Sequence, residues 1–146
     1  MGADDRGETL LELLIAVAIM GVAVMAIVGG IGVGVLMSDV HRKQATAGTA
    51  VRDFGEAVEN QVMAGGYFPC AAPAKYAAPA GYSAPTGFTS SVSAVRYWSS
   101  GAWANTCGTD SGLQQVTVQV ASTDGRASEQ LAVVVRRSCG LKDALC

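Results

Sequence analysis

The chain has 146 residues, 50% of them hydrophobic, and a formal net charge of −2 at pH 7. This length suffices for one domain and not comfortably for two. The charged residues form no block of one sign, which excludes the basic surface typical of nucleic-acid-binding proteins. No nucleic-acid partner is therefore predicted.

The hydrophobic residues are concentrated near the N-terminus, where residues 13–37 carry no charged side chain. A helix of about 20 residues crosses the hydrocarbon core of a bilayer, so this run predicts a membrane-spanning helix. A secretory signal peptide has a basic start and an apolar core of roughly 7–15 residues, whereas this run is longer and follows Asp4, Asp5 and Arg6. A plain membrane anchor leaves Glu12 unexplained, because a carboxylate buried in lipid costs several kcal/mol.

The segment around this glutamate, RGETLLELLIAVAIMG at residues 6–21, resembles the N-terminus of type IV pilins and the related pseudopilins. The resemblance rests on Gly7, on Glu12 and on the uncharged run that follows. It implies that residues 1–7 are a leader that prepilin peptidase removes on the cytoplasmic side. Glu8 would then be the first mature residue and the site of N-methylation, and Glu12 the fifth. Because the cut precedes the apolar run, the run stays in the mature protein.

The same resemblance implies an assembly role for Glu12. In filaments of this family the apolar helices pack side by side, and the glutamate pairs with the free N-terminal amine of a neighbouring subunit. Because an unpaired carboxylate would be costly in such a dry core, the pair aligns two subunits. This chain departs from the family at Glu8, where phenylalanine is usual. It also departs from the positive-inside rule, since Arg42 and Lys43 lie on the outer side and only Arg6 lies in the leader.

The apolar run contains a glycine-rich stretch at residues 29–34. Each glycine inside a helix costs up to about 1 kcal/mol relative to alanine. Two interpretations stay open. The glycines are either small residues that permit a close helix contact, or a stretch that unwinds when a subunit leaves lipid for a filament.

Residues 38–64 predict a continuation of the helix with one apolar face. Apolar residues three and four positions apart form a single stripe, made of Val51, Phe54, Val58 and Val62. No proline occurs before Pro69, and Gly65-Gly66 supplies a stop signal. We therefore expect one helix over residues 9–63 whose second half lies on a sheet.

The next segment, residues 65–87, is rich in proline, alanine and glycine and predicts a loop. A flexible linker is one interpretation. Tyr67, Cys70, Tyr76 and Tyr82 favour the other, a surface loop fixed to the domain.

Three strands are predicted after the loop, at residues 89–98, 113–122 and 128–137. Asp124-Gly125 between the last two predicts a two-residue type I′ turn, in which opposed residue numbers sum to 249. Val118 then faces Leu131 and Val116 faces Val133, so the apolar residues collect on one face. The predicted fold class is α+β, a long N-terminal helix packed on a small three-stranded antiparallel sheet. Pilin-like proteins share this general architecture.

All four cysteines follow the apolar run, at Cys70, Cys107, Cys139 and Cys146. Their even number and wide spacing favour disulfides, and the lack of a C-x-x-C pair disfavours zinc. Disulfides imply that this part of the chain lies outside the cytoplasm. The pairing Cys107–Cys139 with Cys70–Cys146 is slightly preferred, and Cys70–Cys107 with Cys139–Cys146 is close behind.

The sequence shows no arrangement of residues typical of catalysis, so no enzyme activity, cofactor or metal site is predicted. His41, the single histidine, is expected to be an interfacial polar residue. Tyr97, Trp98 and Trp103 are interpreted as core residues in preference to a contact surface.

The predicted organisation is a leader at residues 1–7, a membrane and assembly helix at 8–37, an amphipathic continuation at 38–64 and an extracytoplasmic head at 65–146. The resemblance implies a structural subunit of a type IV pilus or related filament, a minor pilin by preference, which is a single-pass membrane protein before assembly and lies at the cell surface afterwards. Its partners would be other pilin subunits, prepilin peptidase, the assembly machinery and membrane lipid. The alternatives are a pseudopilin of a type II secretion or DNA-uptake system and an anchored extracellular binding domain that never polymerises.

Overall fold

The structure, a computed structural model, describes residues 5–138, with side chains from Thr9 onward. Residues 1–4 of the predicted leader, and both Cys139 and Cys146, lie outside the described residues. The chain divides into two compact units, residues 1–39 and residues 40–146.

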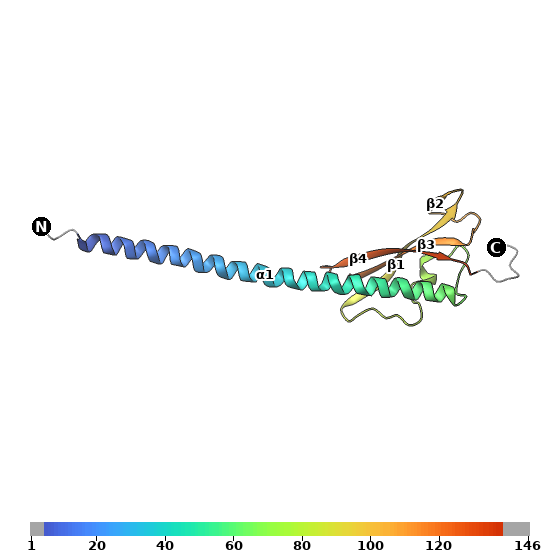
Figure 1. The fold of residues 1–146 in the computed structure, drawn as a ribbon, viewed down its shortest axis with the longest axis horizontal. Helices are drawn as coiled ribbons and strands as arrows, with labels where there is room; N and C mark the ends of the chain where they lie inside the picture. Colours follow the sequence, from blue (N-terminus) through green and yellow to red (C-terminus); the bar gives the residue numbers. More distant parts are fainter. Residues whose placement is uncertain (1–4, 139–146) are drawn as a thin grey trace. The chain divides into compact units, whose positions relative to one another are not determined.

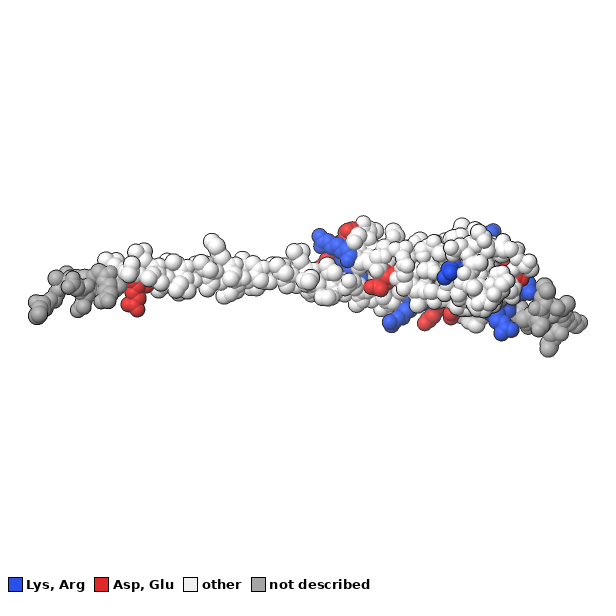
Figure 2. Space-filling model, turned by 90° about the horizontal axis from the view of Figure 1, so that it is seen from above, with Lys and Arg blue, Asp and Glu red and all other residues white. Residues whose placement is uncertain are grey.

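Helix α1 extends from Asp5 to Met63 and supplies the described part of the first unit. It ends at the predicted residue and begins before the predicted residue 9. The large apolar side chains from Leu10 to Met37 are 52–79% exposed. After Glu12, residues 13–37 carry no charged side chain, and this part of the helix is white in Figure 2. Among the described residues, α1 is the one helix long and apolar enough to cross a membrane. A helix that is apolar on all sides requires lipid or other helices around it.

In the second unit, α1 lies along one face of the sheet (Figure 1). The predicted stripe of Val51, Phe54, Val58 and Val62 is at most 5% exposed, which confirms the helical periodicity. The helix packs closely on the sheet at Gly55. A β-carbon there would lie 3.0 Å from side-chain atoms of Leu131 and Val133, so a small residue lets the helix pack directly on the sheet.

The end of α1 follows the predicted Gly65-Gly66 stop. The Gly65 N–H donates to the Val62 carbonyl at 3.0 Å and the Gly66 N–H donates to the Gln61 carbonyl at 2.9 Å. These two bonds form a Schellman motif, which satisfies carbonyls that the last helical turn leaves unpaired. Gly65 has a φ of +91°, a conformation that glycine adopts without steric cost.

The sheet is antiparallel and has four strands in the order β2-β1-β3-β4. The strands are β1 (Phe88–Ser99), β2 (Ala102–Ala104), β3 (Leu113–Ser122) and β4 (Ser128–Arg136). The predicted number of three is wrong because β2 has only three residues, too few to show an alternating pattern. A two-residue turn at Ser100-Gly101, with φ values of 49° and 84°, joins β2 to β1. Two successive positive φ values are those of a type I′ turn.

The hairpin between β3 and β4 has the predicted register, with Val116 opposite Val133 and Val118 opposite Leu131. The predicted turn is wrong. Gly125 alone has a positive φ in this loop, and its N–H donates to the Ser122 carbonyl at 3.0 Å. The loop is therefore longer and contains a turn centred on residues 123–124. The predicted strand register is nevertheless correct, because a longer loop with the same centre leaves the sum of opposed residue numbers at 249.

The segment at residues 65–87 is a loop fixed to the domain, as predicted. Tyr76 is 0% exposed and Tyr67 is 9% exposed. Tyr82 stacks on Phe54 of α1, with ring centroids 4.7 Å apart and planes inclined by 10°. A short 3-10 helix, η1 (Pro73–Lys75), ends just before Tyr76. The tyrosines thus anchor a proline-rich segment that carries little regular structure.

Candidate functional site

The N-terminal motif lies in the first turns of α1. Gly7 and Glu8 have helical backbone, and Glu12 lies about one turn further along. The Glu12 side chain is exposed, as are Leu11 and Leu13 beside it. No residue with a described side chain forms an ion pair with Glu12. Among the described side chains of residues 10–37, the helix therefore presents a single carboxylate on a surface that is otherwise apolar.

The head contains one disulfide among its described residues, between Cys70 and Cys107, with the two Cα atoms 5.5 Å apart. The preferred pairing of Cys107 with Cys139 is wrong, and the alternative that paired Cys70 with Cys107 is confirmed for this bond. The bond joins the loop after α1 to the segment that leads into β3.

Beside the disulfide, the carboxylate of Asp110 accepts hydrogen bonds from four groups. The Tyr67 hydroxyl donates at 2.8 Å and the Cys70 N–H at 2.7 Å. The Gly112 N–H and the Gln114 side-chain amide donate as well. Asp110 thereby ties two positions of the loop after α1 to the start of β3.

A second group of hydrogen bonds extends this network into the core. The Gln114 amide nitrogen donates to the Phe68 carbonyl at 2.9 Å, and the Tyr76 hydroxyl donates to the Gln114 amide oxygen at 3.3 Å. The Tyr97 hydroxyl donates to the Ala71 carbonyl at 2.8 Å. Gln114 is 0% exposed, and a buried amide is tolerated because its donor and acceptor are both satisfied.

The network shifts the pKa values of its members in opposite directions. Burial raises the pKa of Asp110, but the hydrogen bonds from Gly112, Cys70, Tyr67 and Gln114 outweigh burial, so the pKa lies below its usual value. Burial and the bond to Asp110 raise the pKa of Tyr67. At neutral pH the carboxylate is charged and the phenol is not, which is the arrangement that the hydrogen bond requires.

The sulfur atoms of Cys70 and Cys107 and a carboxylate oxygen of Asp110 lie within 4.8 Å of one another. Such a cluster has the composition of a metal site. Both sulfurs are committed to the disulfide, and metal coordination by cysteine requires the thiolate. Asp110 accordingly serves the hydrogen-bond network.

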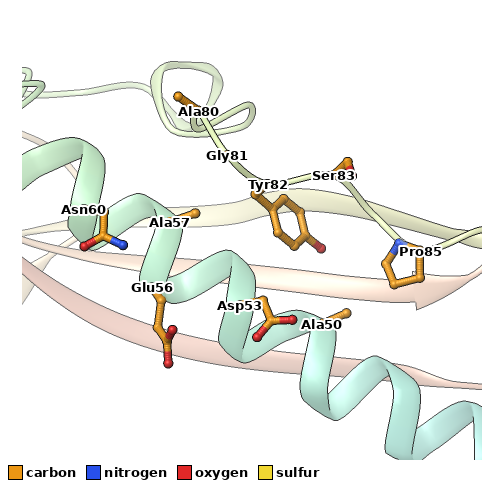
Figure 3. A pocket seen from close by; sticks show the side chains of 10 residues that line it. All are labelled: Ala50, Asp53, Glu56, Ala57, Asn60, Ala80, Gly81, Tyr82, Ser83 and Pro85. Atoms are coloured by element: carbon orange, nitrogen blue, oxygen red, sulfur yellow. The ribbon is translucent and has the colours of Figure 1, made fainter.

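A groove of about 470 Å³ runs between α1 and residues 80–85 of the fixed loop (Figure 3). Asp53, Glu56 and Asn60 of α1 form one wall, and the ring of Tyr82 lies against the other side. Asp53 and Glu56 are both exposed. The groove is open, and its lining carries the two carboxylates of Asp53 and Glu56.

The three aromatic residues at the β1–β2 end divide between the two faces of the sheet. Tyr97 packs against the core as predicted. Trp98 and Trp103 are opposite each other in the ladder and lie on the other face, half-buried and edge to face, with centroids 5.2 Å apart. The core interpretation is therefore wrong for the tryptophans, because β1 alternates its side chains between faces.

No family model, curated protein or solved structure matches this chain.

The structure brings the predicted site residues Cys70 and Cys107 together, whereas Gly7, Glu8 and Glu12 belong to the first unit. Sequence reasoning missed Asp110 as a network centre. The signal was Asp110-Ser111-Gly112, since aspartate two residues before a glycine N–H is typical of an Asx-turn.

Proposed function

We propose that this chain is a membrane-anchored structural subunit of a type IV pilus or a related filament. The observation that carries the proposal is the placement of Gly7, Glu8 and Glu12 at the entrance of a long helix with exposed apolar side chains. The head then supplies a disulfide-bonded α+β domain for display outside the membrane.

The apolar part of α1 supports the proposal because it needs two successive environments. Side chains exposed by 52–79% along Leu10–Met37 require cover. Lipid covers them before assembly, and helices of neighbouring subunits cover them afterwards. A helix that only anchored a domain would need the first environment alone, and a uniformly apolar entrance would serve it best.

Glu12 supplies the selection step in this mechanism. Cleavage after Gly7 frees the amine of Glu8, and the amine of one subunit neutralises the Glu12 carboxylate of the next. A charge that is unfavourable in one subunit is thereby compensated only in the assembled pair. The carboxylate of Glu8 belongs to the same residue as this amine, so it weakens the attraction of the amine for the neighbouring Glu12.

Cleavage is the first test. Intact-mass spectrometry of the full chain in a membrane that contains prepilin peptidase should show loss of residues 1–7, with a methyl group on the new N-terminus at Glu8. The matched control is Gly7→Leu, which should leave the chain uncut. A mature chain that still begins at Met1, or one cut after the apolar run, would show that the pilin proposal is wrong.

Assembly is the second test. Glu12→Ala should leave membrane insertion intact and reduce the amount of subunit in sheared filaments. Glu129→Ala, which removes a carboxylate from the head, should assemble normally. If the Glu12→Ala variant reached the wild-type amount in filaments, the pairing role proposed for Glu12 would be wrong.

An anchored binding domain that never polymerises is the second candidate. The partly exposed Trp98 and Trp103 on the open face of the sheet favour it, because aromatic residues are enriched in contact surfaces. This candidate predicts a chain that keeps residues 1–7, so the mass measurement separates the two.

A further inference from the structure

The face of the sheet that points away from α1 has an uneven charge. Strand alternation and register place no aspartate or glutamate on this face in β1–β4. Its two charged residues are Arg96 and Arg136. The Arg96 guanidinium donates to the Trp103 carbonyl at 3.1 Å, which fixes it over the β1–β2 end. The charge on the open sheet face is therefore entirely positive.

Apolar side chains accompany the two arginines on this face. Trp98 and Trp103 contact each other across β1 and β2, and Leu113 is the next residue across the ladder on β3. Val134 on β4 is 49% exposed. We call this surface, defined by Arg96, Trp98, Trp103, Leu113, Val134 and Arg136, the sheet face. Arginine and tryptophan are the residue types most enriched at the centres of protein interfaces.

The opposite side of the same unit has the complementary charge. Between residues 52 and 60, the ridge of α1 that points away from the sheet carries three carboxylates, Asp53, Glu56 and Glu59, against one guanidinium, Arg52, and all four residues are exposed. None of the three carboxylates forms an ion pair with a described residue. Asp53 and Glu56 also line the groove beside Tyr82 (Figure 3). We call this ridge with its groove the helix face.

We propose that the head binds a second copy of itself head to tail, with the sheet face of one copy seated on the helix face of the next. The two faces belong to the two layers of one domain, since α1 covers the other side of the sheet (Figure 1). They meet at the edge strand β4, where Val134 and Arg136 line a groove with Glu59. A symmetric contact of sheet face on sheet face would oppose arginine with arginine. A contact between two different faces leaves one of each unoccupied, so the array stays open and extends. The inference rests on the proposed function, since an extending array is what a filament subunit needs.

Photocrosslinking of the full chain in membranes tests this contact. A p-benzoylphenylalanine at Trp98, which lies on the sheet face away from the β4 edge, should give an adduct of two copies. Mass mapping should place the far end within residues 52–60. The same probe at Lys75, an exposed residue on neither face, should give no adduct there. An adduct that maps to the sheet face of the second copy, an adduct with a different protein, or no adduct would each overturn the proposal.

Charge reversal sharpens the test. Arg136→Glu and Glu56→Arg should each lower the yield of the 52–60 adduct by about tenfold, since a repulsive pair replaces an attractive one. The double variant carries both changes in every copy, restores opposite signs across the contact and should recover the yield. Lys75→Glu is the matched control and should leave the yield unchanged. If both single variants keep the wild-type melting temperature and the double variant does not recover the yield, the proposed charge pairing across the contact is wrong.

Measurement of the N-terminus in the same samples separates the two proposals. A chain cut after Gly7 that gives no 52–60 adduct would keep the proposed function and overturn the head-to-tail contact. An uncut chain that gives the adduct would do the opposite.

Discussion

At the scale of single residues, Asp110 determines how the loop after α1 is held. Its two oxygens accept bonds from the side chain of Tyr67 and the backbone of Cys70, which lie about forty positions away in the sequence. A carboxylate that accepts several N–H and O–H bonds stays charged to a lower pH than one in water. The hydrogen bonds of this one side chain thus link loop geometry to pH.

Stability should therefore depend on pH through Asp110. Its folded pKa is lower than its unfolded value of about 3.9. The contribution is full above that value and is lost as pH falls from about 4 towards the folded pKa. Asp110→Asn should reduce the free energy of unfolding by about 1–2 kcal/mol at pH 7 and flatten this acid limb. Urea titrations of the detergent-solubilised chain between pH 3 and 7 measure both, with Asp53→Asn as an exposed control. An unchanged acid limb in Asp110→Asn would contradict the assignment.

At the scale of elements, periodic segments were predictable and contacts between aperiodic segments were not. The stripe from Val51 to Val62 and the register of Val118 against Leu131 follow from the sequence, because burial of one face constrains every third or every second residue. Strand β2 has only three residues and no period to detect. The pairing of Cys70 with Cys107 depends on the path of the loop after α1, which is set by contacts of Tyr67, Tyr76 and Asp110.

Two glycines, one inside α1 and one at its end, give a further prediction. The same substitution should change the free energy of unfolding in opposite directions at the two sites. Gly65→Ala should destabilise the chain by about 1 kcal/mol, because alanine is strained at a φ of +91°. Gly48→Ala should stabilise it by up to about 1 kcal/mol, because Gly48 lies inside α1 with no atom within 4 Å of the added carbon. Thermal unfolding followed by circular dichroism measures both. Equal shifts in the same direction would mean that residue 65 does not adopt the left-handed conformation.

The corrected disulfide gives a further prediction at this scale. Cys70→Ser, Cys107→Ser and the double variant should each lower stability by roughly 3–4 kcal/mol, because each opens the same loop of 37 residues. Equality of the three values is the diagnostic result, and peptide mapping of the oxidised protein identifies the bond directly. A double variant much less stable than either single variant would show that the two cysteines belong to different bonds.

At the scale of the whole molecule, apolar exposure and core packing are divided between the two units. The exposed side chains from Leu10 to Met37 belong to the first, and the packed core of α1 on the sheet belongs to the second. Solubility and folding should therefore be separable by truncation.

We expect a chain of residues 40–146 to remain soluble without detergent. It should keep the near-ultraviolet circular dichroism of Trp98 and Trp103, because the buried core lies within this unit. The full chain should partition into membranes. Size-exclusion chromatography and membrane flotation provide the measurements. An aggregated or unfolded fragment would mean that the first unit contributes to the stability of the head.

The hydrogen bond from the Cys70 N–H to Asp110 has a consequence for oxidative folding. Asp110 lies three positions after Cys107, so its carboxylate brings one particular pair of thiols together before either is oxidised. With four thiols in the chain, this preference selects a partner during a step in which thiolates exchange freely. The carboxylate then acts as a template for a covalent bond in which it has no part, and a chain without it would oxidise to a mixture of isomers.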